Sequence, residues 1–302
     1  MLRIQSFDDL RKCCEKMIVK SRLAVAAADD EHTLEAVLKA QKLEIVTPIL
    51  VGDSARIKTA LANLGFSLND FVVYHTSDNI EAARVAVSLV RDGKADFLMK
   101  GSCPTRDLLR AVVDKEIGLS DKRLMSHCTI LEVPGLGRLL GVSDGGMVPY
   151  PDLMEKKAII ENEAAVFHTF GNDNPKVGVL TSIEVVNPKM PETVEAAKLA
   201  EMNAQGEIKG CIVAGPISYD VAMDPETARY KGYDGPVQGD ADILITHDIH
   251  AGNILVKALY CSANSKLAGF IVGAKAPIVV SSRGASAEDK FNSILASAAS
   301  LG

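Results

Sequence analysis

The sequence predicts an α/β fold divided into two lobes. Short apolar runs rich in Val, Ile and Ala recur along the chain, and amphipathic or Ala-rich stretches of helical length follow them. This alternation is typical of parallel strands joined by crossover helices. At 302 residues the chain also exceeds the usual size of one hydrophobic core, which favours two lobes.

The regular part of the alternation comes first in the chain. Ten strands are predicted, at residues 22–28, 45–51, 70–75, 95–99, 138–143, 176–181, 210–214, 243–246, 267–272 and 277–281. Helices predicted at residues 31–42, 54–64, 79–92 and 105–114 follow the first four strands in turn, which gives a doubly wound lobe. Between residues 119 and 140 two strand-like pieces are broken by Pro134, Gly135 and Gly137. We therefore place residues 1–124 in the first lobe and residues 125–274 in the second.

Composition and charge exclude several classes of protein. Hydrophobic residues make up 47% and charged residues 24% of the chain, unlike disordered, fibrous or membrane-spanning proteins. The 33 basic and 39 acidic residues give a net charge of −6, which disfavours a nucleic-acid coat but permits a local basic pocket. No stretch suits a signal peptide or a membrane span, and the six cysteines lack disulfide-type or metal-type spacing. We predict a cytoplasmic protein with free thiols, no metal, and no membrane or nucleic-acid partner.

The loop after the fourth predicted strand suits an anion. Ligands bind at the carboxyl ends of strands in open α/β sheets, and here Lys100 and Gly101 end a strand before a helix begins near Thr105. Backbone N–H groups at a helix start favour phosphate, and Arg106 and Arg110, four residues apart, share one helical face. In the alternative interpretation, Thr105 only caps the helix and both arginines are solvated.

The loop after the last predicted strand gathers a hydroxyl, a guanidinium and a carboxylate. Ser282 and Arg283 lie at the strand end, and Asp289 lies one turn into the next helix, where it can point back at the same ligand. The alternative is structural. Ser286 and Asp289 have the spacing of a capping box, in which Asp289 only accepts hydrogen bonds from backbone N–H groups.

Two other motifs are weaker. Residues 141–145 match the G-x-S-x-G nucleophile elbow, with Asp248 and His250 following in hydrolase order. An elbow serine leads directly into a helix, whereas the glycines and prolines of residues 145–151 prevent a helix before about residue 151. His247 and His250 are metal-ligand types, but no third and fourth ligands are evident nearby. Standard dinucleotide and P-loop motifs are missing from the sequence.

Several segments, taken in their order and spacing, resemble the phosphate acetyl- and butyryltransferases, and the butyryl branch most closely. These segments are residues 40–53, 94–119, 174–177, 187–191, 208–211, 215–222, 251–253 and 276–293. The resemblance implies two α/β/α lobes with a cleft between them, similar to the isocitrate and isopropylmalate dehydrogenases. It also implies that residues 275–302 return to complete the first lobe, and that the protein forms a homo-oligomer built on dimers.

The reaction that this family implies is the reversible transfer of a short-chain acyl group, butyryl or similar, between CoA and inorganic phosphate. Acyl-CoA, phosphate and acyl phosphate are then substrates and products, and no further cofactor is expected. By resemblance, Asp289 takes the proton from the CoA thiol, with Glu288 as the alternative base. Ser282 would hydrogen-bond the phosphate or the developing oxyanion, and Arg283 would supply the stabilising cation.

The remaining substrate contacts are predicted at four positions. Arg110 matches a substrate-binding arginine of the family, whereas Lys100, Gly101 and Thr105 are proposed from their local chemistry alone. Two other functions stay open, a decarboxylating hydroxy-acid dehydrogenase of the same fold and a non-catalytic phosphate- or CoA-binding protein. The sequence leaves the acyl-chain preference, the number of subunits and the physiological direction undetermined.

Overall fold

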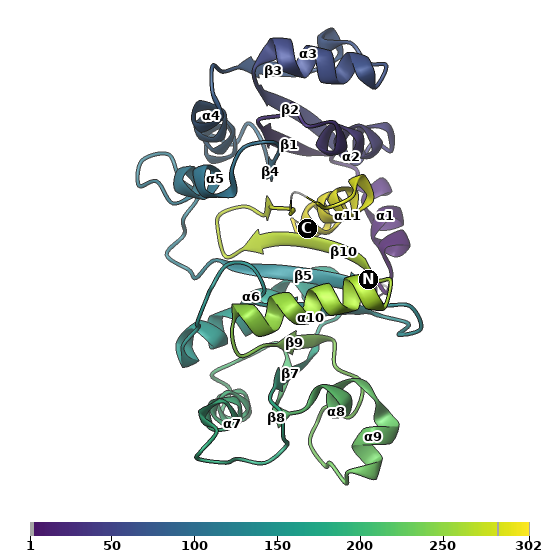
Figure 1. Ribbon diagram of the computed structural model, residues 1–302, viewed down its shortest axis with the longest axis vertical. Coiled ribbons are helices and arrows are strands. Elements are labelled where there is room, and N and C mark those ends of the chain that lie inside the picture. Colours follow the sequence, from purple (N-terminus) through teal and green to yellow (C-terminus); the bar gives the residue numbers. More distant parts are fainter. Residues whose placement is uncertain (1–2, 283, 302) are drawn as a thin grey trace. The chain divides into compact units, whose positions relative to one another are not determined.

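The structure, a computed structural model, describes residues 3–282 and 284–301. Its contacts divide the chain into two compact units. The first unit comprises Phe7–Arg123 and Ala268–Gly302, and the second comprises Met1–Ser6 and Leu124–Leu267. Both are built of strands and helices in alternation, so the predicted α/β class is confirmed (Figure 1).

The units differ from the predicted lobe boundaries at two places. Residues 1–6 belong to the second unit, because the Ile4 amide donates a hydrogen bond to the Phe170 carbonyl and Arg3 pairs with Asp242. Residues 268–274 belong to the first unit, because the strand that contains most of them pairs with the strand at residues 278–279. The cleft between two lobes stays a prediction.

The first unit contains six strands in the spatial order β3-β2-β1-β4-β11-β10. These are β1 (Ser21–Ala26), β2 (Val46–Gly52), β3 (Val72–His75), β4 (Phe97–Lys100), β10 (Lys266–Val272) and β11 (Ile278–Val279). Strands β3, β2, β1, β4 and β11 run parallel to one another, and β10 is antiparallel to β11. The carboxyl ends of the five parallel strands therefore lie along one edge of this sheet.

The helices of the first unit are α1 (Phe7–Glu15), α2 (Glu31–Lys42), α3 (Ser54–Asn63), α4 (Asn79–Arg91), α5 (Thr105–Val112) and α11 (Ala287–Ala299), with a short 3₁₀ turn η1 (Leu68–Asp70). Aspartates cap the starts of α2, α3 and α4, which explains why these helices begin directly after their loops. Helix α11 is buried from Asp289 to its end, since it packs against α1 and α2 (Figure 1).

The second unit has the strand order β5-β6-β9-β7-β8. Its strands are β5 (Ser126–Glu132), β6 (Leu139–Ser143), β7 (Lys176–Leu180), β8 (Ile212–Ile217) and β9 (Ile243–Ile245). Among these described strands the β5–β6 pair is antiparallel, and the β6–β9, β9–β7 and β7–β8 pairs are parallel. Its helices are α6 (Leu153–Thr169), α7 (Pro191–Ala204), α8 (Tyr219–Met223), α9 (Pro225–Tyr230) and α10 (Ile249–Ser262). Apolar side chains from β5, β6 and β9 meet those of β8 and α8 in its core.

The predicted elements agree closely with the observed ones. Helix α2 has the predicted bounds, and the other three predicted helices end within two residues of their predicted positions. Every predicted strand is present, although β11 is shorter than expected. Strand β5 was foreseen only as a strand-like piece within residues 119–140.

Candidate active site

The loops after β4 and β11 leave the same edge of the first unit's sheet. Strand β11 pairs in parallel with β4, with Ile278 beside Leu98 and Val279 beside Met99. Strand β11 ends at Val279 and β4 ends at Lys100, so these two adjacent strands finish at the same edge of the sheet. The two loops that carry the predicted site residues therefore start from adjacent strand ends, although they are far apart in sequence.

Gly101 is required by close packing of the backbone at the ends of β1 and β4. Its amide donates a hydrogen bond to the Ala26 carbonyl at 2.8 Å, and the Ser102 amide donates to the Ala27 carbonyl at 2.9 Å. A Cβ atom on Gly101 would lie 2.1 Å from the Ala27 carbonyl oxygen. No larger residue fits without displacing the loop. The packing of the backbone therefore requires a glycine here, whether or not Gly101 also contacts substrate as predicted.

Lys100 is buried, and its ammonium group holds the loop that follows β4. Nζ donates to the carbonyl oxygens of Gly101 at 3.0 Å and Cys103 at 3.4 Å. Burial raises the pKa of the Cys103 thiol to about 11, although the Lys100 charge acts in the opposite direction. The lysine therefore places a positive charge beneath the loop, and Cys103 is a neutral thiol at physiological pH.

The start of α5 lacks a side-chain cap. Pro104 occupies the N-cap position and makes no side-chain cap hydrogen bond, so the alternative interpretation that Thr105 caps this helix is wrong. Thr105 and Arg106 are exposed, and the Arg106 Nε lies 3.6 Å from an Asp107 carboxylate oxygen. Arg110 is exposed in the last turn, about 7.5 Å along the helix axis from Thr105. Only the first turn of α5 is thus close to the sheet edge.

Asp289 lies at the start of α11 and takes part in a capping box. Its Oδ2 accepts hydrogen bonds from the Ser286 amide at 3.1 Å and the Ser286 hydroxyl at 2.6 Å, and its own amide donates to that hydroxyl. The predicted capping geometry is confirmed, whereas the role of Asp289 as a base stays a prediction. The carboxylate is almost completely buried, so any proton that it takes must come from a group held close to it.

The other residues of this loop have different surroundings. Ser282 is exposed in the loop three residues after β11, and Arg283 lies outside the described residues. Glu288, the alternative base, is 56% exposed and forms an ion pair with Lys39 of α2 at 2.5 Å. This pairing turns Glu288 toward the surface of α2, which favours Asp289 over Glu288 as the base.

Acidic residues after β1 complete this edge of the sheet, and sequence reasoning missed them. The Asp29 carboxylate is buried, pairs with Arg56 at 2.7 Å and accepts a hydrogen bond from Ser102. The Asp30 carboxylate accepts a hydrogen bond from Lys290 Nζ at 2.6 Å. Asp29 and Asp30 could have been identified from the sequence, because both directly follow the first predicted strand, where a ligand is expected to bind.

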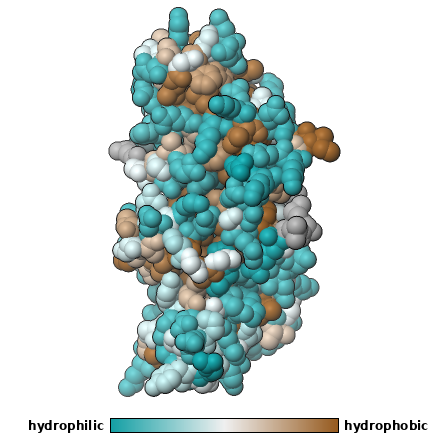
Figure 2. Space-filling model, turned by 90° about the vertical axis from the view of Figure 1, so that its right-hand side faces the viewer, coloured by the Kyte–Doolittle hydropathy of each residue, from teal (hydrophilic) through white to brown (hydrophobic). Residues whose placement is uncertain are grey.

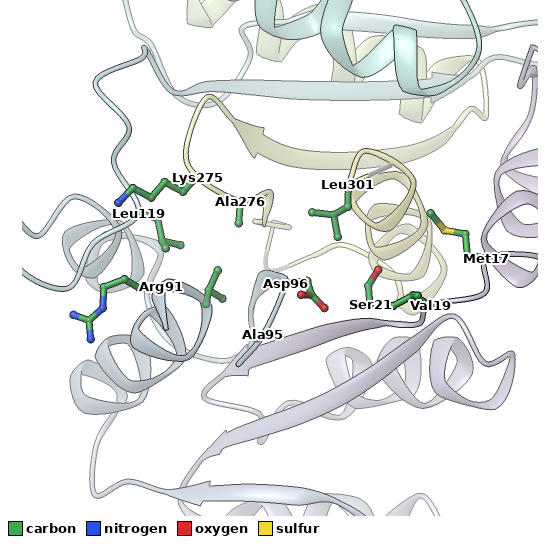
Figure 3. A pocket seen from close by; sticks show the side chains of 11 residues that line it. Met17, Val19, Ser21, Arg91, Ala95, Asp96, Leu119, Lys275, Ala276 and Leu301 are labelled. Atoms are coloured by element: carbon green, nitrogen blue, oxygen red, sulfur yellow. The ribbon is translucent and has the colours of Figure 1, made fainter. Parts of the chain in front are cut away.

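A cavity of about 490 Å³ lies at the opposite edge of the same sheet. It is lined by Ser21 at the start of β1, Asp96 just before β4 and Ala276 just before β11. Figure 3 shows Lys275 and Arg91 at one end of the cavity, and Met17 and Leu301 at the other. None of the predicted site residues that the structure describes lines this cavity.

The G-x-S-x-G motif does not form a nucleophile elbow. Ser143 is buried, and its hydroxyl forms hydrogen bonds with the His127 carbonyl and the Glu163 carboxyl group. The next helix, α6, begins only at Leu153, as expected from the intervening glycines and prolines. Asp248 accepts a hydrogen bond from the Ala251 amide as the N-cap of α10.

The two histidines near that cap do not converge on a common site. His250 Nε2 lies 3.1 Å from the Tyr150 hydroxyl, whereas His247 Nδ1 lies 3.4 Å from the Lys156 ammonium. In the part of the chain that the structure describes, no three His, Cys, Asp or Glu side chains are grouped so as to hold a metal ion.

Comparison with known proteins identifies the family. The family described as "Phosphate acetyl/butaryl transferase" matches residues 75–298. The chain belongs to this family. It is 42% identical to a phosphate butyryltransferase from Clostridium acetobutylicum over 96% of both chains. It is also 43% identical to a phosphate acetyltransferase from Thermotoga maritima, over 94% of this chain and 98% of the relative.

A solved structure supports the same assignment. The chain resembles a branched-chain phosphotransacylase from Enterococcus faecalis with a TM-score of 0.84 and 32% identity, over 93% of this chain and 99% of the other. The resemblance inferred from the sequence is confirmed, and this member of the phosphate acetyl/butyryltransferase family is an enzyme. The range matched by the family includes both loops at the carboxyl edge of the first unit's sheet.

The surface of this family member is mainly hydrophilic on the face shown in Figure 2, where hydrophobic side chains form only separate patches. Within residues 3–282 and 284–301, no helix combines the length and the apolar character needed to cross a membrane.

Proposed function

We propose that this protein is a phosphate acyltransferase that moves a short-chain acyl group, butyryl or similar, reversibly between CoA and inorganic phosphate. The observation that supports this most strongly within the fold is the pairing of β11 with β4, which brings the Ser282 loop beside the Lys100–Gly101 loop. Membership of the family supplies the reaction class. CoA and phosphate are both substrates in this proposal, and no additional cofactor takes part.

Phosphate would bind at the start of α5. The helix start has no side-chain cap, so its first backbone N–H groups are available to an anion, and the helix dipole favours negative charge there. Lys100 adds a buried positive charge beneath the same loop. Arg110 would contact substrate only by extending back along α5, so its effect should be on binding.

The chemistry would take place beside Ser282 and Asp289. An oxygen of hydrogen phosphate attacks the thioester carbonyl carbon, the C–S bond breaks through a tetrahedral intermediate, and the sulfur leaves with the bonding electrons and takes up the proton that the phosphate gives up. In the reverse direction Asp289 takes the proton from the CoA thiol as its sulfur attacks the acyl phosphate. A positioned base of this kind contributes roughly 10²- to 10⁴-fold.

Ser282 would donate a hydrogen bond to the oxyanion of the intermediate, and Arg283 is proposed as the cation that stabilises it. Loss of one such donor typically costs about 2.7–4 kcal/mol in the barrier. The two-lobed arrangement similar to isocitrate dehydrogenase, the cytoplasmic location and the homo-oligomer built on dimers also remain proposals.

The decisive experiment is thiol release in phosphate buffer from acetyl-, propionyl-, butyryl- and isobutyryl-CoA. We expect the highest kcat/KM for acyl groups of three or four carbons. Turnover of NAD or NADP with a hydroxy acid, and no thiol release, would instead favour the dehydrogenase. Binding of CoA without any turnover would favour the non-catalytic alternative.

The roles of the two carboxylates are separated by a matched pair of variants. Asp289→Asn should lower kcat at least tenfold, the lower end of what loss of a general base costs. Glu288→Gln changes the adjacent carboxylate and should leave kcat within about twofold. The opposite pattern would assign the base to Glu288. Ser282→Ala should lower kcat about 10²- to 10³-fold.

A further inference from the structure

Lys290 is a buried cation in the first turn of α11, where two physical effects oppose its charge. Its side chain is only 7% exposed, and burial disfavours the charged form of a lysine. The positive end of the helix dipole also disfavours a cation at a helix N-terminus. A lysine at this position therefore needs a specific partner.

That partner is Asp30, the N-cap residue of α2. Lys290 Nζ donates to Asp30 Oδ2 at 2.6 Å and to the Thr33 hydroxyl at 3.0 Å. The Asp30 carboxylate also accepts a hydrogen bond from the Thr33 amide at 2.9 Å. Burial alone would raise the pKa of Asp30, but the Lys290 ammonium and the Thr33 hydroxyl hold it below its usual value. One ionised carboxylate thus joins the N-termini of two helices.

Both N-termini lie at the carboxyl edge of the first unit's sheet. Helix α2 follows β1, helix α11 follows β11, and β4, which ends in Lys100, lies between these strands. Lys290 directly follows Asp289, whose carboxylate is fixed to Ser286 by the capping box. A contact that fixes the first turn of α11 therefore also fixes the position of Asp289 relative to the end of β1.

We propose that Lys290 is a positioning residue for acyl transfer, and that its ion pair with Asp30 sets the orientation of Asp289. This inference rests on the proposed function. Such a role accounts for an ion pair between side chains that are 7% and 31% exposed, because a pair largely removed from water adds little net stability compared with apolar residues of similar volume.

The same two helices offer a matched control. Lys39 of α2 pairs with Glu288 of α11 at 2.5 Å, with side chains 44% and 56% exposed, and its ammonium lies 4.1 Å from the centre of the Phe291 ring. This second lysine also bridges α2 and α11, but it does so at the surface. A general effect of joining the two helices should appear in both lysine variants, whereas an effect on the site should appear only at Lys290.

The experiment compares Lys290→Met, Lys290→Arg, Lys39→Met and the double variant Lys290→Met/Asp30→Asn. Asparagine keeps the N-cap oxygen of α2, and the double variant leaves no unpaired buried charge. For each protein, kcat and KM are measured with butyryl-CoA and phosphate, and the thermal midpoint is recorded.

We expect Lys290→Met and the double variant to lose at least tenfold in kcat, with KM for butyryl-CoA within about twofold, because small misplacement of a reacting group is costly. Lys290→Arg should recover most of kcat, and Lys39→Met should match the wild type. If Lys290→Met does not fold, the kcat of the double variant tests the positioning role of Lys290 in its place.

Two results would overturn the proposal in distinguishable ways. A folded Lys290→Met or double variant with wild-type kcat would remove the positioning role and leave the acyltransferase proposal intact. A wild-type protein and a Lys39→Met variant that both release no thiol would overturn the proposed function, and the role of Lys290 with it.

Discussion

Glu163 offers a quantitative test of the second unit, because burial changes how the stability of the protein depends on pH. The side chain lies on α6, completely buried, and accepts a hydrogen bond from the Ser143 hydroxyl. Burial raises the pKa of Glu163 from 4.5 to about 8, with a smaller contribution in the same direction from the Asp144 charge. The carboxyl group is therefore neutral in the folded protein at pH 7 and ionised in the unfolded chain.

The sign of the pH effect follows from proton binding. Between pH 4.5 and about pH 8 the folded state holds a proton that the unfolded state has released, so the free energy of unfolding falls as the pH rises. The slope is about 1.4 kcal/mol per pH unit, and the loss across the whole interval is of the order of 5 kcal/mol. Below pH 4.5 Glu163 makes its full contribution to the free energy of unfolding, and above about pH 8 this contribution is lost.

Glu163→Gln removes this dependence while conserving the size of the side chain. We expect the variant to lack this pH-dependent loss and to become progressively more stable than the wild type as the pH rises from 5 to 8. Urea unfolding followed at several pH values measures the difference. Glu161→Gln is the control, because this glutamate is on the same helix but pairs with Lys157 and is 41% exposed. Parallel pH profiles for the wild type and Glu163→Gln would refute the reasoning.

Three further predictions concern the first unit and the thiols. Gly101→Ala places a Cβ atom 2.1 Å from the Ala27 carbonyl oxygen, so we expect a lower thermal midpoint, equivalent to about 1–3 kcal/mol, together with a loss of kcat/KM. Arg110→Gln should raise KM for phosphate or acyl-CoA with kcat little changed if this arginine only binds substrate, whereas an equal fall in kcat and kcat/KM would contradict that role. The exposed Cys261 should dominate rapid labelling by a thiol reagent, and Cys261→Ser should remove this phase. Cys103 should react slowly below pH 11, since burial raises its pKa to about 11.

Local features of the fold were predictable from the sequence. Helices α2, α3 and α4 begin after aspartates that cap them, and their apolar spacing fixes the buried face. The strands were recognisable as short apolar runs. The motif at residues 141–145 was also interpreted correctly, because the glycines and prolines of residues 145–151 delay the next helix to Leu153.

Contacts between distant segments were not predictable in the same way. The resemblance to a family implied that residues 275–302 return to the first lobe, but it did not specify the pairing of β11 with β4, and no periodicity specifies which strands pair. The Lys290–Asp30 pair joins residues 260 positions apart, and nothing in the sequence around either residue specifies the other as its partner. The role of Asp289 was ambiguous in the sequence, because the three-residue spacing of Ser286 and Asp289 fits a capping box as well as a carboxylate that points at a ligand.

The position of β11 has a consequence for the order in which the protein folds during its synthesis. This strand is inserted between β4 and β10, so the sheet of the first unit is incomplete until residues 268–302 have left the ribosome. Nearly all of the second unit, Leu124–Leu267, is continuous in sequence and emerges earlier. We expect the second unit to reach its native structure before β11 has been synthesised and can pair with β4. During that interval the edge of β4 is open to incorrect pairing with other chains.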